Sequence, residues 1–139
     1  MKTDLKLDQK MHIIADDGHG HETHFDTIEK KGGDNSAATP MMVMLESLGA
    51  CSFMDVISIL RKKRKSVDGF EIHIEAERAK EHPQVFTEVH LVYELTSSDA
   101  EEKDLDRSIE LSQDKYCGVS AMFRNSGCKV TWESKLNRP

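Results

Sequence analysis

The sequence predicts an α+β fold with largely antiparallel strands and one long central helix, built as a single domain over residues 1–139. Apolar and polar residues alternate with the period of a β-strand in several segments. One long segment is apolar over most of a helical circumference, and a capping signature near residue 98 indicates a further helix. No internal repeat and no shift in composition indicates a second domain.

The N-terminal part of the chain is expected to form a hairpin. Residues 6–14 and 22–28 are strand candidates, and the turn-forming cluster DDGHG at residues 16–20 joins them. A polar loop follows at residues 30–35 and contains two consecutive glycines, Gly32 and Gly33. The first 35 residues therefore predict two paired strands followed by a loop.

Thr39 and Pro40 mark the start of the central helix, with threonine as the N-cap and proline at the first helical position. The helix is expected over residues 41–63 and is apolar nearly all round until the basic run RKKRK at residues 61–65. A helix apolar on every side is a buried one, and so short a chain has few elements to cover it. Packing against a second copy of the chain is therefore expected. Glu46 and Asp55 interrupt the apolar stretch, which argues against a membrane span.

The C-terminal part predicts a second pair of strands, two helices and a closing strand. Residues 70–76 and 85–95 alternate between apolar and polar side chains and are expected to pair as an antiparallel hairpin. Ser98 and Glu101 have the spacing of a capping box, which predicts a helix that ends near Lys115. A short helix is expected over residues 118–124, and a strand over residues 129–136 closes the fold.

Composition limits the possible functions. The formal net charge is −6, so neither a nucleic-acid backbone nor an anionic membrane is expected as a partner, because either requires a basic face. Residues 1–11 contain no apolar stretch of signal-peptide length, and a soluble cytoplasmic protein is expected. Three cysteines in such a chain do not indicate a disulfide framework. Each one is either a buried small residue or a reactive thiol.

Cys51 and Cys117 are the candidate catalytic residues. Cys51 lies midway along the central helix beside Gly49 and Ala50, whose small side chains allow another group to come close. Cys117 is expected at the N-terminus of the short second helix, where free backbone N–H groups and the helix dipole favour a thiolate and lower its pKa. For both, the competing interpretation is a buried structural residue. Cys128 stands where a strand begins and is expected to be structural.

Other polar clusters give weaker signals. His12, His19, His21 and His24 crowd the N-terminal hairpin but lack cysteine or carboxylate partners at a recognised metal-ligand spacing, so no metal site is expected. The basic run is typical of a solvated helix end. Asp55 lies one turn after Cys51 and would raise the pKa of a neighbouring thiol, so it is expected to pair with a base elsewhere.

Three blocks of the sequence resemble the OsmC/Ohr family. Residues 39–56 (TPMMVMLESLGACSFMDV) resemble the family's central-helix signature, residues 81–90 (EHPQVFTEVH) look like the hairpin block of its OsmC-like branch, and residues 110–122 (ELSQDKYCGVSAM) look like the block around its second cysteine. Their order and spacing match, and the resemblance covers nearly the whole chain.

The resemblance implies a fold, an assembly and an activity. The implied fold is an intertwined homodimer in which antiparallel sheets wrap around long central helices, with active sites at the dimer interface. Cys51 matches the peroxidatic cysteine, which reduces an organic or lipid hydroperoxide and becomes a sulfenic acid. Cys117 matches the resolving cysteine, which closes a disulfide that an external dithiol reduces. No cofactor is implied.

The sequence departs from the family pattern at the residues that hold the cysteine as a thiolate. Well-studied peroxidases of the family use an N-terminal arginine and a glutamate at the start of the central helix. Here no arginine precedes Arg61, and the positions after Pro40 are Met41 and Met42. Lys30, Lys31 or Arg124 are candidate replacements for the cation. The alternative function is a non-catalytic module that binds an apolar ligand in the dimer cleft; a metal protein built on the N-terminal histidines is the least supported.

Overall fold

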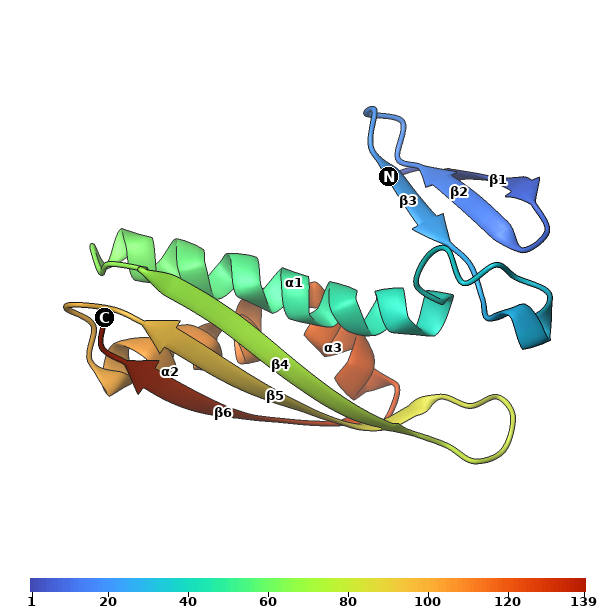
Figure 1. The fold of residues 1–139 in the computed structure, drawn as a ribbon. Helices are drawn as coiled ribbons and strands as arrows, with labels where there is room; N and C mark the ends of the chain where they lie inside the picture. The colour runs from blue at the N-terminus through green and yellow to red at the C-terminus, as the bar shows by residue number, and fades with distance from the viewer. The chain divides into compact units, whose positions relative to one another are not determined.

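The computed structural model describes all residues from 1 to 139, which form two compact units, Met1–Glu46 and Ser47–Pro139 (Figure 1). The elements in chain order are β1 (Asp4–Gln9), β2 (His12–Asp16), β3 (Glu22–Phe25), the 3₁₀ turn η1 (Glu29–Lys31), α1 (Pro40–Lys62), β4 (Gly69–Arg78), β5 (Phe86–Thr96), α2 (Glu102–Leu111), the π-helical turn η2 (Ser112–Tyr116), α3 (Gly118–Asn125) and β6 (Lys129–Asn137). The predicted α+β class is confirmed.

The first unit holds a three-stranded antiparallel sheet in the order β1-β2-β3, so the predicted two-stranded hairpin was wrong. Residues 6–14 do not form one strand, because the chain reverses at Lys10, whose φ of 48° is left-handed. Leu7 pairs with Ile13 and Gln9 with His12 across this turn. The turn carries neither glycine nor proline, so the alternating pattern alone gave no sign of it.

A buried aspartate organises the loop after β3. The carboxylate of Asp26 accepts hydrogen bonds from the Thr27 N–H at 2.8 Å and from the Ser36 N–H and hydroxyl at 3.0 and 2.6 Å. The Ser36 hydroxyl, followed by these backbone donors, holds the pKa of Asp26 well below its usual range. Gly33 is required nearby, since a Cβ there would lie 2.1 Å from the Thr27 carbonyl oxygen.

The long helix α1 begins and ends as the sequence predicts. The Thr39 hydroxyl accepts a hydrogen bond from the Met42 N–H at 3.4 Å, Pro40 is the first helical residue, and Arg64 with φ 60° lies beyond the end. By length and composition α1 would suffice to cross a membrane, although the core helix of a soluble protein passes the same test. One side of α1 lies against the sheet of the second unit, but only 28% of its apolar stretch is buried, so one chain alone does not bury the helix all round as the sequence predicts.

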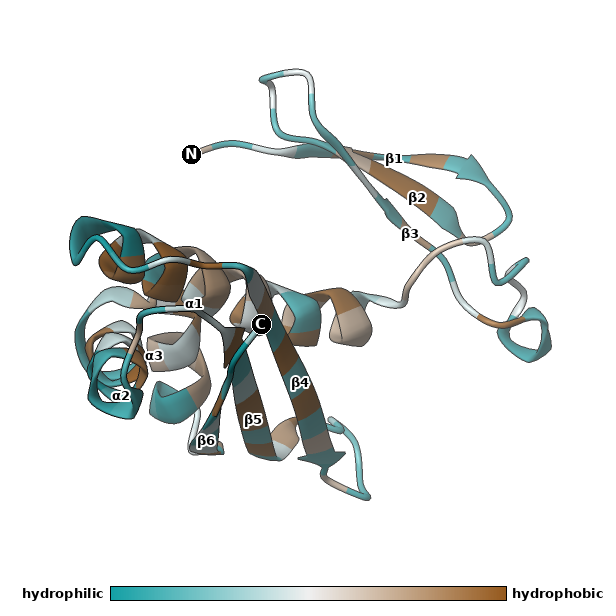
Figure 2. Cartoon of the chain, turned by 60° about the vertical axis from the view of Figure 1, so that its left-hand side comes forward, coloured by the Kyte–Doolittle hydropathy of each residue, from teal (hydrophilic) through white to brown (hydrophobic).

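The second unit is a two-layer structure in which α1, α2 and α3 lie on one face of the sheet β4-β5-β6 (Figures 1 and 2). The strands β4 and β5 pair antiparallel along their whole length, as predicted. Hydrophobic and hydrophilic residues alternate along both strands (Figure 2). The core combines β5 residues with residues of α1 and α2: Val89, Leu91, Tyr93, Leu95, Leu48, Val56, Leu60, Leu105 and Ile109.

The closing strand β6 runs parallel to β5, from Glu88 opposite Lys129 to Thr96 opposite Asn137, and is the exception to the largely antiparallel pairing that the sequence predicts. A parallel partner requires a long crossover connection. The helices α2 and α3 supply it, and they return the chain to the end of the sheet at which β5 began. Residues 97–128 thereby lie over the same sheet face as α1 (Figure 1).

The glycine in α1 allows the helix to approach the sheet. A Cβ at Gly49 would lie 2.7 Å from Cδ1 of Ile74, so a larger residue would require the end of the Ile74 side chain to shift. Close approach beside Cys51 was predicted from this glycine, and the group that approaches is Ile74 of β4. Next along the helix, Phe53 packs edge-on against Phe70 of β4, with 4.7 Å between ring centroids.

The helix α2 uses a different capping box from the one predicted. Glu101 is the N-cap, and the Asp104 carboxylate accepts the Glu101 N–H at 3.1 Å. The backbone N–H of Ser98 is bound instead by the Ser66 hydroxyl and by Asp68, at 3.1 and 3.0 Å. Ser98 therefore forms tertiary hydrogen bonds with the loop before β4 and does not cap α2.

Most of the basic run is solvated, in agreement with the prediction. Arg61, Lys62, Lys63 and Arg64 are exposed, and Lys65 is half-buried. Lys63 and Lys65 form ion pairs with Asp104 in the first turn of α2, at 3.7 and 3.3 Å. The run therefore also ties the end of α1 to the start of α2.

Candidate active site

Cys51 and Asp55 lie one helical turn apart on α1, and both are half-buried. Their face of the helix is turned toward η2, because the Asp55 carboxylate accepts a hydrogen bond from the Ser112 hydroxyl at 3.0 Å. The expectation that Asp55 pairs with a base was wrong. A neutral hydroxyl binds it, and no lysine, arginine or histidine forms an ion pair with it.

Cys117 occupies the junction between η2 and α3. It is the N-cap of α3, as the sequence predicted, and its Sγ accepts the Ser120 N–H at 3.3 Å. Its own N–H donates to the Ser112 carbonyl at 2.7 Å, which closes the π-helical turn. Only 3% of Cys117 is exposed. A π-helical turn inserted in a helical segment is frequent at functional sites, and here it sets the position of the thiol.

The structure brings the two predicted cysteines together. The Sγ atoms of Cys51 and Cys117 and a carboxylate oxygen of Asp55 all lie within 4.8 Å of one another, and both thiols are free. The neighbouring Cys51 is one of the groups that raise the pKa of the Cys117 thiol. Residues 66 positions apart in sequence therefore meet because η2 packs against the middle of α1.

The expected lowering of the Cys117 pKa was wrong. Burial raises the pKa of this thiol to about 11, and the neighbouring Cys51 and the charge of Asp55 act in the same direction. The hydrogen bond from the Ser120 N–H lowers the pKa, as expected at a helix N-terminus, but it does not outweigh the loss of solvation. Cys117 is therefore a protonated thiol at neutral pH.

A buried polar network lies directly behind the thiols. The Ser52 hydroxyl is 2.6 Å from the Tyr93 hydroxyl and 2.8 Å from the Ser112 hydroxyl. The Gln113 amide donates to the Tyr93 hydroxyl at 2.7 Å, and its carbonyl oxygen accepts from the Ser120 hydroxyl at 2.5 Å. Every buried side-chain nitrogen and oxygen of the chain has a partner. Burial raises the pKa of Tyr93 despite its bonds to Ser52 and Gln113.

Sequence reasoning missed this network. The period-two pattern of β5 placed Tyr93 on the inner face among apolar residues, which signals a hydroxyl that needs a buried partner. Nothing in the sequence pointed to Ser52, Ser112 or Gln113 as that partner, because they come from α1 and η2.

Arg124 belongs to the same network. Its guanidinium donates to the Ser120 hydroxyl at 3.0 Å, to the side-chain oxygen of Gln113 at 3.3 Å and to the Gln113 backbone carbonyl. The candidate cation therefore holds η2 against α3 and does not form a bond to Cys51. Lys30 and Lys31 belong to η1 in the other compact unit.

Cys128 lies apart from the thiol pair. It is 5% exposed, its thiol points toward the Lys129 carbonyl at 3.8 Å, and burial raises its pKa. This is the environment of the structural residue that the sequence predicted.

The N-terminal histidines form a cluster of their own. Nε2 of His12 lies 2.8 Å from Nδ1 of His24, and the rings stack with centroids 5.0 Å apart. The remaining nitrogens face Asp8 at 2.9 Å and Glu22 at 3.2 Å. His21 instead pairs with Asp17 at 2.7 Å. Asp8 and Glu22 are thus the carboxylate partners that the sequence spacing did not reveal. Each ring nitrogen of His12 and His24 is occupied by a hydrogen-bond partner.

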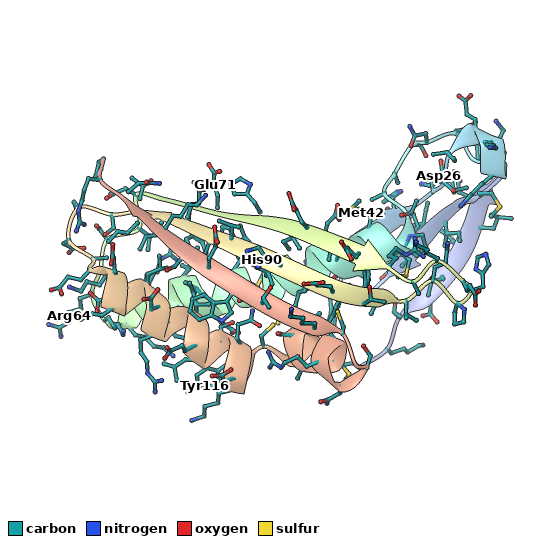
Figure 3. All side chains as sticks on the ribbon, turned by 90° about the horizontal axis from the view of Figure 1, so that it is seen from below. Asp26, Met42, Arg64, Glu71, His90 and Tyr116 are labelled. Carbon is teal, nitrogen blue, oxygen red and sulfur yellow. The ribbon has the colours of Figure 1, made fainter.

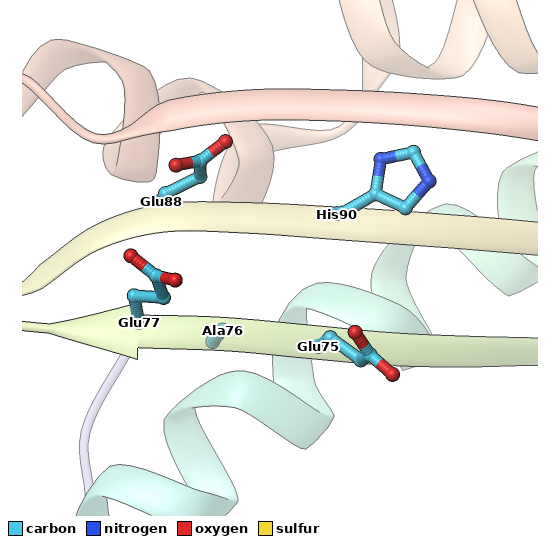
Figure 4. A pocket seen from close by; sticks show the side chains of 5 residues that line it. All are labelled: Glu75, Ala76, Glu77, Glu88 and His90. Carbon is cyan, nitrogen blue, oxygen red and sulfur yellow. The ribbon is translucent and has the colours of Figure 1, made fainter.

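A shallow hollow of about 530 Å³ lies on the sheet face that the helices leave open, lined by Glu75, Ala76, Glu77, Glu88 and His90 (Figure 4). This face is polar along the sheet, with Glu71 and His90 among its exposed or half-buried residues (Figure 3). The hollow contains no thiol, whereas both candidate cysteines lie in the helical layer. The hollow is therefore not part of the thiol site.

Comparison with known proteins identifies the family. Residues 33–133 match the OsmC-like protein family. Protein YhfA of Escherichia coli (strain K12) is 32% identical over 126 residues, which cover 91% of each chain. A hypothetical protein from Aquifex aeolicus has a solved structure with a TM-score of 0.81 and 31% identity, covering 97% of this chain and 96% of that one.

A more distant structure shares the fold. An organic hydroperoxide resistance protein from Legionella pneumophila superposes with a TM-score of 0.63 at 12% identity, covering 98% of this chain and 95% of that one. The chain belongs to the OsmC-like family.

Proposed function

We propose that this OsmC-like protein is a thiol-dependent peroxidase that reduces organic or lipid hydroperoxides in the cytoplasm, as part of oxidative stress defence. The observation that carries the proposal is the meeting of Cys51 and Cys117, whose sulfur atoms lie within 4.8 Å of each other as free thiols. The family membership and the hydroperoxide resistance protein that shares the fold support it.

Cys51 is the attacking residue in this proposal, because it is the half-exposed member of the pair. Its thiolate attacks the terminal oxygen of the hydroperoxide, so that an S–O bond forms as the O–O bond breaks. Cys51 becomes a sulfenic acid, and the leaving alkoxide takes a proton from water and departs as the alcohol. The protonated Cys117 thiol lies within 4.8 Å of the Cys51 Sγ and is a nearby donor for the negative sulfur before attack. The family's usual glutamate is absent, since α1 has no acidic residue in its first turn.

Cys117 is the resolving residue. Its thiol condenses with the sulfenic acid to form the Cys51–Cys117 disulfide, and water leaves. An external dithiol then reduces the disulfide by exchange, becomes oxidised itself and restores both thiols. Bond formation requires the sulfur atoms to close to about 2.05 Å. Cys117 reaches Cys51 by movement at the η2–α3 junction, where its backbone is extended and not helical.

The experiment is a thiol titration of the reduced protein with cumene hydroperoxide. The wild type is expected to lose two thiols per equivalent of oxidant, Cys51→Ser none, and Cys117→Ser one, with a sulfenic acid that dimedone traps. Cys128→Ser is the matched control and is expected to behave as the wild type. Reaction of all variants at the rate of free cysteine would remove the peroxidase function.

We propose further that the protein is a homodimer through the outer face of α1. Phe53, Met54 and Ile57 line a groove of about 660 Å³ on this face, and 72% of Met54 is exposed. Contiguous exposed apolar residues mark interaction surfaces. Met54→Glu is expected to shift the mass measured by light scattering toward the monomer, whereas Met122→Glu, at an exposed position on α3, leaves it unchanged.

A further inference from the structure

The thiol site has the composition of a metal site as well as that of a redox pair. Cys51 and Asp55 come from successive turns of α1, Cys117 comes from the start of α3, and one donor atom of each lies within 4.8 Å of the other two. Donors about 2.3 Å from a tetrahedral ion lie about 3.8 Å from each other. Small side-chain adjustments therefore suffice to place all three around one ion.

The charge of the site is unbalanced. Asp55 is half-buried, yet no cation forms an ion pair with it and its one hydrogen-bond partner is the Ser112 hydroxyl. Arg124 donates its hydrogen bonds to Gln113 and Ser120. Lys63 and Lys65 form their ion pairs with Asp104. A carboxylate and two thiols thus converge with no cation at ion-pair distance, an arrangement that a bound cation would complete.

The buried network fixes the orientation of the carboxylate. An ionised Asp55 can only accept, so Ser112 donates to it and must accept from Ser52. The Ser52 hydroxyl then accepts from the Tyr93 hydroxyl.

The other end of the network gives the same direction. The Gln113 amide nitrogen can only donate, so the Tyr93 hydroxyl accepts from it and donates to Ser52. All these hydrogen bonds run toward Oδ2 of Asp55 and leave its other oxygen free. An outer hydrogen bond of this kind orients a ligating carboxylate.

We propose that reduced Cys51 and Cys117, together with Asp55, bind a thiophilic divalent cation of the Zn²⁺ type. Two sulfurs and one carboxylate oxygen suit such an ion, with a fourth position left for water. A groove of about 330 Å³ opens Asp55 to solvent, and Lys62 and Lys63 also line it without forming an ion pair with Asp55. Since the disulfide has no free thiolate, metal binding and oxidation of the pair exclude one another, and the inference does not depend on peroxidase activity.

The first test uses Cd²⁺ as a spectroscopic probe and Zn²⁺ in competition with a chromophoric chelator, on the reduced full-length protein. One ion per chain is expected, with the ultraviolet charge-transfer band of a cadmium–thiolate bond. Cys51→Ser and Cys117→Ser should each lose about half of the band and bind Zn²⁺ about 100-fold more weakly. Asp55→Asn should keep the band and bind about 10-fold more weakly.

Two matched controls locate the ion. Cys128→Ser removes a thiol outside the cluster, and His24→Ala removes an imidazole of the N-terminal sheet; both should bind as the wild type does. Circular dichroism verifies that each variant is folded. A band that survives in the Cys51→Ser/Cys117→Ser double variant, or no binding by the wild type at micromolar metal, would overturn the inference.

The outcome is separable from that of the peroxidase proposal. A protein that binds one ion but does not react with cumene hydroperoxide retains the metal site and loses the enzyme function. A protein that reacts but shows no cadmium–thiolate band retains the enzyme function and loses the metal site.

Discussion

Two clusters of polar side chains in this chain differ in how they are held. Around Cys51 and Cys117, the residues Ser52, Tyr93, Ser112, Gln113 and Ser120 are buried, and each hydroxyl and amide has a fixed partner. In the N-terminal sheet, His12 and His24 contact each other and two exposed carboxylates. Buried hydrogen bonds have no water to replace them, whereas exposed ones do. The first cluster is therefore expected to be essential to stability, and the second dispensable.

The largest expected effect is that of Gln113→Ala. The substitution removes the side chain that joins Tyr93, Ser120 and Arg124, so each of these groups loses one buried hydrogen bond and a cavity remains between them. We expect the free energy of unfolding to fall by about 3 kcal/mol. Urea denaturation at pH 7 measures it, with Asp114→Ala in the exposed part of η2 as the control. A loss no larger than that of the control would show that the network does not stabilise the fold.

A smaller loss is expected for Tyr93→Phe. The ring and its packing remain, and the amide of Gln113 already lies 3.4 Å from the Ser52 hydroxyl, so these two groups can partly replace the lost bonds. We expect a decrease of about 1–2 kcal/mol in the free energy of unfolding. A double-mutant cycle with Ser52→Ala should show coupling of about 1 kcal/mol. Additive effects would contradict a connected network.

Asp26 tests the comparison within the N-terminal unit, because it is a buried acceptor near a sheet whose residues are all exposed or half-buried. Its pKa is lowered when folded, so acid protonates the unfolded form more readily and folding stability falls as the pH drops below the ordinary value of 3.8. The N–H groups of Asp34 and Ser36 donate hydrogen bonds to Asp26. Their hydrogen exchange should accelerate at low pH by more than the intrinsic exchange rate of an unprotected amide changes.

Asp26→Asn is the matching variant. In this variant the same N–H groups should be less protected from hydrogen exchange at pH 7. Their protection should not change further as the pH falls, since no carboxylate remains to be protonated. Equal acid sensitivity of the wild type and the variant would assign the effect to other groups.

The smallest effect is expected for His24→Ala. Its partners are exposed or half-buried side chains that water can solvate, so the free energy of unfolding should change by less than about 0.5 kcal/mol. Thermal unfolding followed by circular dichroism measures the change. If the free energy of unfolding fell as much as it does in Tyr93→Phe, the exposed histidine cluster would contribute to stability as much as the buried network does.

The sequence by itself determined the α+β class, the N-cap and length of α1, the β4–β5 hairpin and the position of Cys117 at a helix start. These features depend on contacts between near neighbours in the chain, which periodicity and capping residues report directly. The resemblance of three blocks also identified the family, which the matched residues 33–133 confirm.

The tertiary structure alone decided the third strand of the N-terminal sheet, the parallel pairing of β6, the partner of Asp55 and the direction of the Cys117 pKa shift. Each depends on which distant segment covers a group and excludes water from it. The helix N-terminus beside Cys117 was visible in the sequence, but the loss of solvation that outweighs it arises only when η2 and α3 pack against α1.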